Sequence, residues 1–121
     1  FRRNVERIIK TADIVVLSSN WEGLPLAVLE GMAAGKPVIA SRVSGLQDIV
    51  EDEEMLFEVG NEQELAEKIS WLLKDERAYA EKAGEARKRS KKYDIKNMVD
   101  RYMETYFELC GTQIYKDDNK V

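Results

Sequence analysis

Hydrophobic and polar positions divide the chain into blocks, each about as long as one helix or one strand. Two short runs, Ile14–Leu17 and Pro37–Ala40, are almost entirely apolar, and such runs are typical of parallel strands buried on both faces. Elsewhere, apolar residues recur at helical spacing. The pattern predicts helices over residues 3–11, 25–35, 46–50, 61–73, 76–91 and 94–110, and a third short strand over 55–57. This alternation favours an α/β fold, with a parallel sheet that carries helices on both faces.

The pattern begins abruptly at the N-terminus. Val5, Ile8 and Ile9 indicate a helix that is already under way near Phe1. Three strands are also few for a sheet of this kind, so we expect earlier strands upstream of Phe1. Residues 1–110 are therefore predicted to be part of one domain. The last residues, 111–121, show no periodicity, and we expect them to form a loose tail.

Composition and charge exclude several classes of function. Of the residues, 44% are hydrophobic and 35% are charged, as in ordinary soluble globular proteins, and the net charge of −4 gives no case for nucleic-acid binding. The chain has no histidine, which excludes histidine-based triads and histidine-ligated metal sites within it. Its one cysteine, Cys110, fits a reducing compartment, and no apolar run approaches the roughly 20 residues of a membrane span. We therefore expect a cytoplasmic protein.

The stretch from Asn20 to Gly35 carries the candidate chemistry. It links the first two predicted strands through a short loop and an apolar helix whose one charged residue is Glu30. We expect this helix to be buried on most sides, so that Glu30 needs hydrogen-bond donors. The helix begins near Pro25, where its free N–H groups and positive dipole end suit a phosphate. Glu22 lies in the loop at the same helix end, beside the loop that follows the next strand.

A plainer interpretation of the same residues stays open. Backbone amides or an arginine such as Arg42 can satisfy Glu30, and water can satisfy Glu22. A loop and helix start without a glycine-rich fingerprint is a weak signal of an anion site. The residues alone therefore leave two interpretations open: a ligand site, or a purely structural role for both glutamates.

Three segments with fixed spacing resemble a known family. They are ADIVVLSS at 12–19, EGLP at 22–25 and LEGMAAGKPVIAS at 29–41. Together they look like the C-terminal domain of family 4 retaining glycosyltransferases, which have the GT-B fold with two Rossmann-like domains. Glu22 and Glu30, with seven residues between them, resemble the family's pair of glutamates. The similarity covers roughly residues 5–110.

The resemblance implies a UDP-, GDP- or ADP-sugar donor, with no metal ion or other cofactor. It implies that Glu30 binds the donor ribose and that Glu22 is the catalytic residue at the donor sugar. Backbone groups would face the diphosphate at Gly23, Leu24, Pro25 and Leu26. Transfer of the hexosyl group would retain the anomeric configuration. The sugar or lipid-linked acceptor would bind an N-terminal domain that this chain does not contain, so we expect the fragment alone to be inactive.

The chain departs from the family pattern after Ser41. Residues 44–48 offer one glycine and an aspartate where the family often has paired glycines and a glutamate, and Glu51–Glu54 replaces a glycine-rich turn. We interpret Glu51–Glu54 as a solvated acidic turn. Two alternatives to a transferase stay open: a sugar-nucleotide epimerase of similar fold, and a non-catalytic nucleotide-binding or interaction module.

Two further features concern partners. Arg87–Lys92 is a basic cluster that most simply forms a solvated face at a helix C-terminus. Its functional alternative is a peripheral contact with the inner face of a membrane. The helix over 94–110 carries a long apolar stripe, for which we predict an exposed patch and a homodimer.

Overall fold

The computed structural model describes residues 4–110. Its helices and strands, in chain order, are α1 (Val5–Thr11), β1 (Val15–Leu17), α2 (Leu26–Ala33), β2 (Val38–Ser41), α3 (Ser44–Val50), β3 (Leu56–Phe57), α4 (Glu62–Lys74), α5 (Glu76–Ser90) and α6 (Ile95–Cys110). Two short 3₁₀ turns, η1 (Glu53–Met55) and η2 (Lys91–Tyr93), were not predicted. Every helix and strand that the sequence pattern predicts is present.

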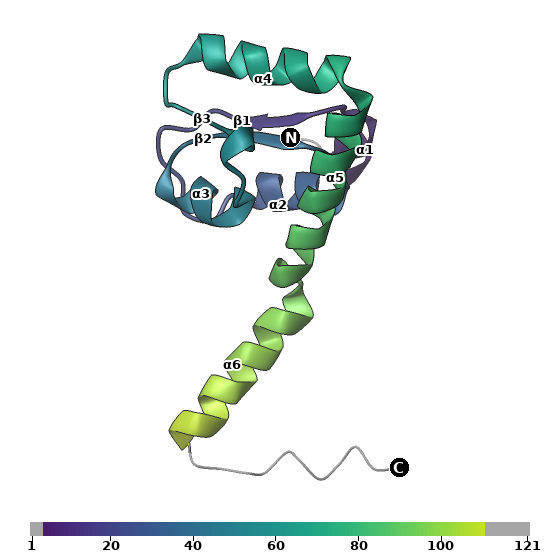
Figure 1. The fold of residues 1–121 in the computed structure, drawn as a ribbon. Helices are drawn as coiled ribbons and strands as arrows, with labels where there is room; N and C mark the ends of the chain where they lie inside the picture. The colour runs from purple at the N-terminus through teal and green to yellow at the C-terminus, as the bar shows by residue number, and fades with distance from the viewer. Residues whose placement is uncertain (1–3, 111–121) are drawn as a thin grey trace. The chain divides into compact units, whose positions relative to one another are not determined.

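The strands form one parallel sheet in the order β1-β2-β3. Figure 1 shows α4 on one face of this sheet and α2 and α3 on the other. The prediction of a parallel α/β sheet with helices on both faces is confirmed. All four residues of β2 are buried, since this strand has a neighbour on each side. The largest fully buried side chains around it include Met32, Ile39, Leu46, Leu56 and Leu72.

Among residues 4–110, strand β1 has a neighbour on one side only, whereas the pattern predicted burial on both faces. It lies at an edge of the sheet, and Val16 is 40% exposed. An apolar β-branched run shows that a segment favours extended structure and burial. It does not show how many neighbours the strand finds, because those come from other parts of the fold.

Helix α2 is buried on one face only, so the prediction of burial on most sides is wrong. Val28, Gly31 and Met32 are buried, whereas Glu30 is exposed. Gly31 allows a close approach to β1, because a Cβ added there would lie 2.8 Å from a methyl carbon of Val15. Small apolar residues make a helix surface compatible with packing, but no described element covers the outer side of α2.

The helix ends follow the predicted signals. Gly35 has φ +71° just past α2, where a left-handed conformation favours glycine. The side chain of Asn61 accepts a hydrogen bond from the Glu64 N–H at 3.1 Å at the start of α4. The Glu64 carboxylate accepts from the Glu58 N–H at 2.9 Å, which joins α4 to the chain that follows β3. The side chain of Asp94 accepts from the Lys96 N–H at 2.9 Å and caps α6.

The chain divides into two compact units, residues up to Lys91 and residues from Lys92. The sheet and α1 to α5 belong to the first unit, and α6 belongs to the second. The predicted apolar stripe is present on α6, with exposed fractions between 42% and 81% at Ile95, Met98, Val99, Tyr102, Met103, Tyr106 and Leu109. The predicted tail, 111–121, lies outside the described residues.

Candidate functional site

Two loops leave the carboxyl ends of β1 and β2 side by side, at one edge of the sheet. Val15 pairs with Val38 and Leu17 with Ala40 in a parallel register, so β1 and β2 end together. The buried Ser41 hydroxyl, at the end of β2, donates a hydrogen bond to the Ser19 carbonyl oxygen at 2.5 Å. The prediction that these loops are neighbours is confirmed. Ligands in open α/β sheets bind at this edge.

Glu22 is held within its own loop. The Ser19 hydroxyl donates a hydrogen bond to the Glu22 Oε1 at 2.7 Å. Glu22 is half-buried, and this bond fixes one carboxylate oxygen, while no protein group among residues 4–110 donates to the second. A carboxylate so held can accept a further hydrogen bond from a ligand hydroxyl.

Gly45, at the start of α3, packs closely against the backbone of the same loop. A Cβ added at Gly45 would lie 2.3 Å from the carbonyl oxygen of Glu22 and 2.4 Å from that of Gly23. Such distances are shorter than any ordinary contact, so the start of α3 and the Glu22 loop approach each other through bare backbone. The glycine that the chain keeps after Ser41 therefore sets the spacing between the two loops.

The start of α2 has the open N-terminus that an anion requires. Pro25 is the N-cap residue, and within the described residues no side-chain hydrogen bond caps this helix. The N–H groups of Val28 and Leu29 donate to the Pro25 carbonyl oxygen, which leaves the N–H groups of Leu26 and Ala27 directed out of the helix end. Gly23 and Leu24, in the loop before it, are exposed. The geometry provides backbone donors and a positive dipole end at the sheet edge.

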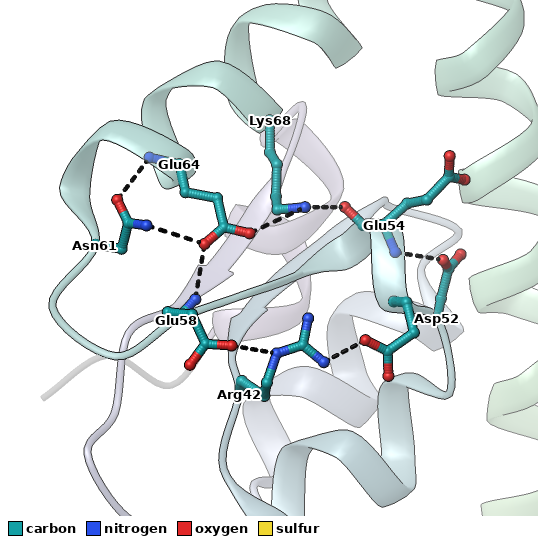
Figure 2. A network of polar contacts seen from close by, with 8 residues as sticks. Arg42, Asp52, Glu54, Glu58, Asn61, Glu64 and Lys68 are labelled. Carbon is teal, nitrogen blue, oxygen red and sulfur yellow. Dashed lines mark hydrogen bonds and ion pairs between the residues drawn. The ribbon is translucent and has the colours of Figure 1, made fainter.

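Glu30 lies in the second turn of α2 on its exposed side. It lies five positions after Pro25, which is roughly 7 Å along the axis at 1.5 Å per residue. The alternative partner Arg42 does not reach it, because Arg42 donates to Glu53 and, at 2.7 Å from Nε, to Glu58. Figure 2 shows the Arg42 side chain directed at these carboxylates. The hydrogen bond to Glu53 has the largest effect on Arg42. Together with the charges of Glu53 and Glu58 and the hydrogen bond to Glu58, it raises the pKa of Arg42.

The acidic turn is not simply solvated, contrary to the interpretation of Glu51–Glu54. The side chain of Asp52 is only 8% exposed and accepts a hydrogen bond from Lys82 Nζ at 3.0 Å. Lys82 also donates to Glu54 at 2.5 Å, and Arg89 lies 3.7 Å from Asp52. Burial works against the charged form of Lys82, but the hydrogen bonds to Glu54 and Asp52 outweigh it and raise its pKa. Nothing in the residue pattern indicated that α5 crosses this turn.

The basic cluster is divided by this ion-pair network. Arg89 is half-buried, and its guanidinium lies 3.5 Å from the Glu85 carboxylate and 3.7 Å from Asp52. Arg87 and Lys88 are exposed. A fully solvated face is therefore a wrong description of Arg89, although it fits Arg87 and Lys88.

Among residues 4–110, no group of three or more His, Cys, Asp or Glu side chains is arranged to hold a metal ion. In the same part of the chain, no helix is both long and apolar enough to cross a membrane.

Three residues of the site were missed from the sequence: Ser19, Ser41 and, in its packing role, Gly45. Serines at strand ends are common, so their type gave no signal. Gly45 was noticed only as a departure from a paired-glycine pattern. Its place at the start of a helix directly after a strand end was the available sign of close backbone approach.

The sequence model of one family matches most of the chain. The family is described as "Glycosyl transferases group 1", and the match covers residues 1–96. These residues include both loops, α2, Glu22 and Glu30.

Individual relatives include several bacterial enzymes. The chain is 32% identical over 107 residues to the N,N'-diacetylbacillosaminyl-diphospho-undecaprenol alpha-1,3-N-acetylgalactosaminyltransferase of Campylobacter jejuni, covering 87% of this chain and 28% of that protein. It is 30% identical over 109 residues to the N-acetyl-alpha-D-glucosaminyl L-malate synthase of Bacillus anthracis, covering 88% and 29%. It is 42% identical over 53 residues to the UDP-Gal:alpha-D-GlcNAc-diphosphoundecaprenol alpha-1,3-galactosyltransferase of Escherichia coli, covering 44% and 14%. The chain thus spans less than a third of each of these relatives.

Proposed function

The chain belongs to the group 1 glycosyl transferases, and on that premise we propose that it is the donor-binding part of a retaining hexosyltransferase. The donor is a UDP-, GDP- or ADP-sugar, and the acceptor hydroxyl is presented by a separate N-terminal domain. The observation that carries this proposal is the uncapped start of α2 at the sheet edge, flanked by Glu22 and Glu30. The chain alone binds donor and does not turn over.

The loop before α2, Glu30 and Glu22 each have a role in this proposal. Gly23, Leu24 and Leu26 are exposed, and their backbone N–H groups, beside Pro25, face the donor diphosphate, where a helix N-terminus favours negative charge. Glu30, about 7 Å along the axis from Pro25, accepts hydrogen bonds from the ribose hydroxyls. Glu22 lies on the other side of the helix start, at the donor sugar.

The reaction exchanges one bond at the anomeric carbon for another. The bond from the anomeric carbon to the diphosphate oxygen breaks, and a bond from the acceptor oxygen forms on the same face. The acceptor proton passes to the departing diphosphate. Negative charge grows on the diphosphate during this step, and the positive end of α2 stabilises it more in the transition state than in the bound donor. Glu22 orients the sugar through its hydroxyl groups.

Calorimetry tests the ribose role of Glu30. UDP, GDP, ADP and their sugars are titrated into the chain and into the complete enzyme, with wild type and Glu30→Ala compared. Loss of hydrogen bonds to a charged group, about 1.5–3 kcal/mol, predicts a Kd that rises about 10- to 100-fold. Glu81→Ala, an exposed glutamate on α5, is the matched control and should leave Kd unchanged. Equal affinity in Glu30→Ala and wild type would refute the ribose role.

Turnover tests the catalytic role of Glu22. In the complete enzyme with an acceptor, Glu22→Ala should lower kcat at least tenfold, while donor affinity changes less. Product analysis should show a new glycosidic bond with retained configuration. Formation of an epimer of the donor sugar, without transfer, would replace the transferase proposal with the epimerase.

We also propose a peripheral membrane location on the cytoplasmic face. Two of the relatives are named for diphospho-undecaprenol substrates, which are lipid-linked. Arg87 and Lys88 are exposed at the end of α5, and Lys91 and Lys92 follow them. Sedimentation with anionic vesicles at low salt tests this, and Arg87→Glu with Lys88→Glu should reduce the bound fraction. Equal binding to neutral vesicles would contradict it.

A homodimer through α6 is the remaining proposal. Each of the seven apolar residues named above on this helix is at least 42% exposed, and such surface favours association. An antiparallel pair would set Lys96 and Arg101 of one copy beside Glu104 and Glu108 of the other. Light scattering should show a dimer that Tyr102→Lys converts to a monomer. A wild-type monomer at high concentration would contradict it.

A further inference from the structure

The packing behind Glu22 points to three residues with an unassigned role. We infer that Ser19, Ser41 and Gly45 are positioning residues, which hold the Glu22 carboxylate at the donor sugar through contacts of the protein itself. The inference rests on the proposed function and deepens it. None of the three needs to touch the donor.

Two hydrogen bonds connect Glu22 to the core of the sheet. The hydroxyl of Ser41, a residue only 1% exposed, donates to the Ser19 carbonyl oxygen at 2.5 Å. The hydroxyl of Ser19 donates in turn to the Glu22 carboxylate at 2.7 Å. The backbone and the side chain of Ser19 are therefore both occupied, one by the end of β2 and the other by Glu22. A residue fixed at both ends gives the carboxylate a defined direction.

Gly45 limits the position of the Glu22 loop through a backbone contact. The carbonyl oxygens of Glu22 and Gly23 lie 2.3 and 2.4 Å from where a Cβ at Gly45 would be. An ordinary contact begins near 3.4 Å, so alanine at this position must move the Glu22 loop or the start of α3 by about one ångström. Both sides of the contact are backbone, so a side-chain rotation cannot relieve the overlap. Gly45 therefore determines where the loop stands relative to α3.

Displacement on this scale is large for a reacting group. A misplacement of about 1 Å can lower turnover roughly 100-fold even where overall binding is little changed. For the two serines the effect should fall on kcat more than on the donor KM, because Gly23, Glu30 and the start of α2 keep their places. A purely structural role would instead lower stability and leave the kinetic constants of the folded enzyme unchanged.

The experiment measures kcat and donor KM in the complete enzyme. We expect Gly45→Ala to lower kcat about 100-fold, and Ser19→Ala and Ser41→Ala about tenfold each. Ser19→Thr keeps the hydroxyl and should restore kcat to within about threefold of wild type. The matched control is Gly84→Ala on α5, because a Cβ there meets no described atom within 4 Å. Its kcat should equal that of wild type.

A double-mutant cycle with Glu22→Ala shows whether the three residues act through Glu22. Residues that act as a unit are strongly non-additive. Once Glu22 is removed, Gly45→Ala and Ser19→Ala should therefore lower kcat by less than about twofold more. If Gly45→Ala does not fold, the Ser19→Ala and Ser19→Thr pair gives the same comparison without a steric clash.

The outcomes separate this inference from the proposed function. Wild-type enzyme without transferase activity, or an unaffected Glu22→Ala, overturns the proposed function. If Glu22→Ala is strongly impaired but the serine and Gly45 variants match Gly84→Ala, the positioning role is refuted and the proposed function stands. Equal losses in the wild-type and Glu22→Ala backgrounds also refute the positioning role.

Discussion

Replacing Lys82 by methionine tests the ion-pair network that holds α5 to the acidic turn. Methionine keeps most of the length and apolar stem of lysine and removes only its charge. In wild type the Lys82 ammonium, on a side chain that is 9% exposed, lies 3.0 Å from Asp52 and 2.5 Å from Glu54. In the variant, Asp52 stays 8% exposed with its main cation gone.

The magnitude follows from what remains around Asp52. Removing one member of a fully buried ion pair costs about 3–5 kcal/mol, because it leaves a buried charge uncompensated. Here Arg89 remains 3.7 Å away, and Glu54 is 66% exposed and can turn to water. We therefore expect a loss of about 2 kcal/mol in the free energy of unfolding. For a chain of this size that is roughly 8 °C in Tm.

Urea unfolding followed by tryptophan fluorescence measures this loss. Both tryptophans, Trp21 and Trp71, lie in the first compact unit, so the signal reports the unit that contains Lys82. Lys88→Met on the same helix removes an exposed charge and should cost less than about 0.5 kcal/mol. The raised pKa of Lys82 adds a pH test. Its stabilising effect is fully present below about pH 10.5 and is lost as the pH rises through the folded-state pKa.

The reasoning is refuted if Lys82→Met and Lys88→Met unfold at the same urea concentration. That result would mean that water or Arg89 compensates Asp52 completely. It is also refuted if the difference between wild type and Lys82→Met does not shrink as the pH rises above about 10.5, because the stabilisation by charged lysine is lost in that direction. A double-mutant cycle with Asp52→Asn should show a coupling of about 1 kcal/mol or more.

Other substitutions separate packing, helix propensity and charge. Gly31→Ala should destabilise by about 1–2 kcal/mol in urea unfolding, because its Cβ would lie 2.8 Å from the Val15 side chain. Gly84→Ala, in the interior of α5, should stabilise by about 0.5–1 kcal/mol, and a decrease in Tm would contradict this. The Glu58 N–H lowers the pKa of the Glu64 carboxyl. The Tm difference between wild type and Glu64→Gln should therefore be present at pH 7 and disappear as the pH falls well below 4.5.

The order of helices and strands could be predicted because each depends on its own residues. β2 is an apolar run, α4 begins at the Asn61 cap, and α2 ends at Gly35 with its positive φ. These signals act within a few residues of where they occur. The parallel sheet followed from the alternation of strand and helix, since parallel strands need a crossover between them.

Burial was predicted poorly because it depends on neighbours that are far along the sequence. Asp52 looked like part of a solvated turn, and only the path of α5, some 30 residues later, places Lys82 over it. Val16 looked like the middle of a buried strand, yet β1 is an edge. The Ser41 hydroxyl and the Gly45 contact belong to the same class, because both join segments about 22 residues apart.

The exposure of Glu30 changes the reason for assigning it to a ribose. A buried lone carboxylate would need donors, but an exposed one is satisfied by water. The proposed ribose role of Glu30 therefore rests on its position. Glu30 lies one and a half turns into a helix whose start has no side-chain cap, in a chain that belongs to a glycosyltransferase family. Glu22 is the reverse case. The residue pattern left open that water alone satisfies it, whereas its bond to Ser19 and the backbone contact with Gly45 hold it in one position. Of the two carboxylates, Glu22 is thus the one whose function should depend on residues that never meet the donor.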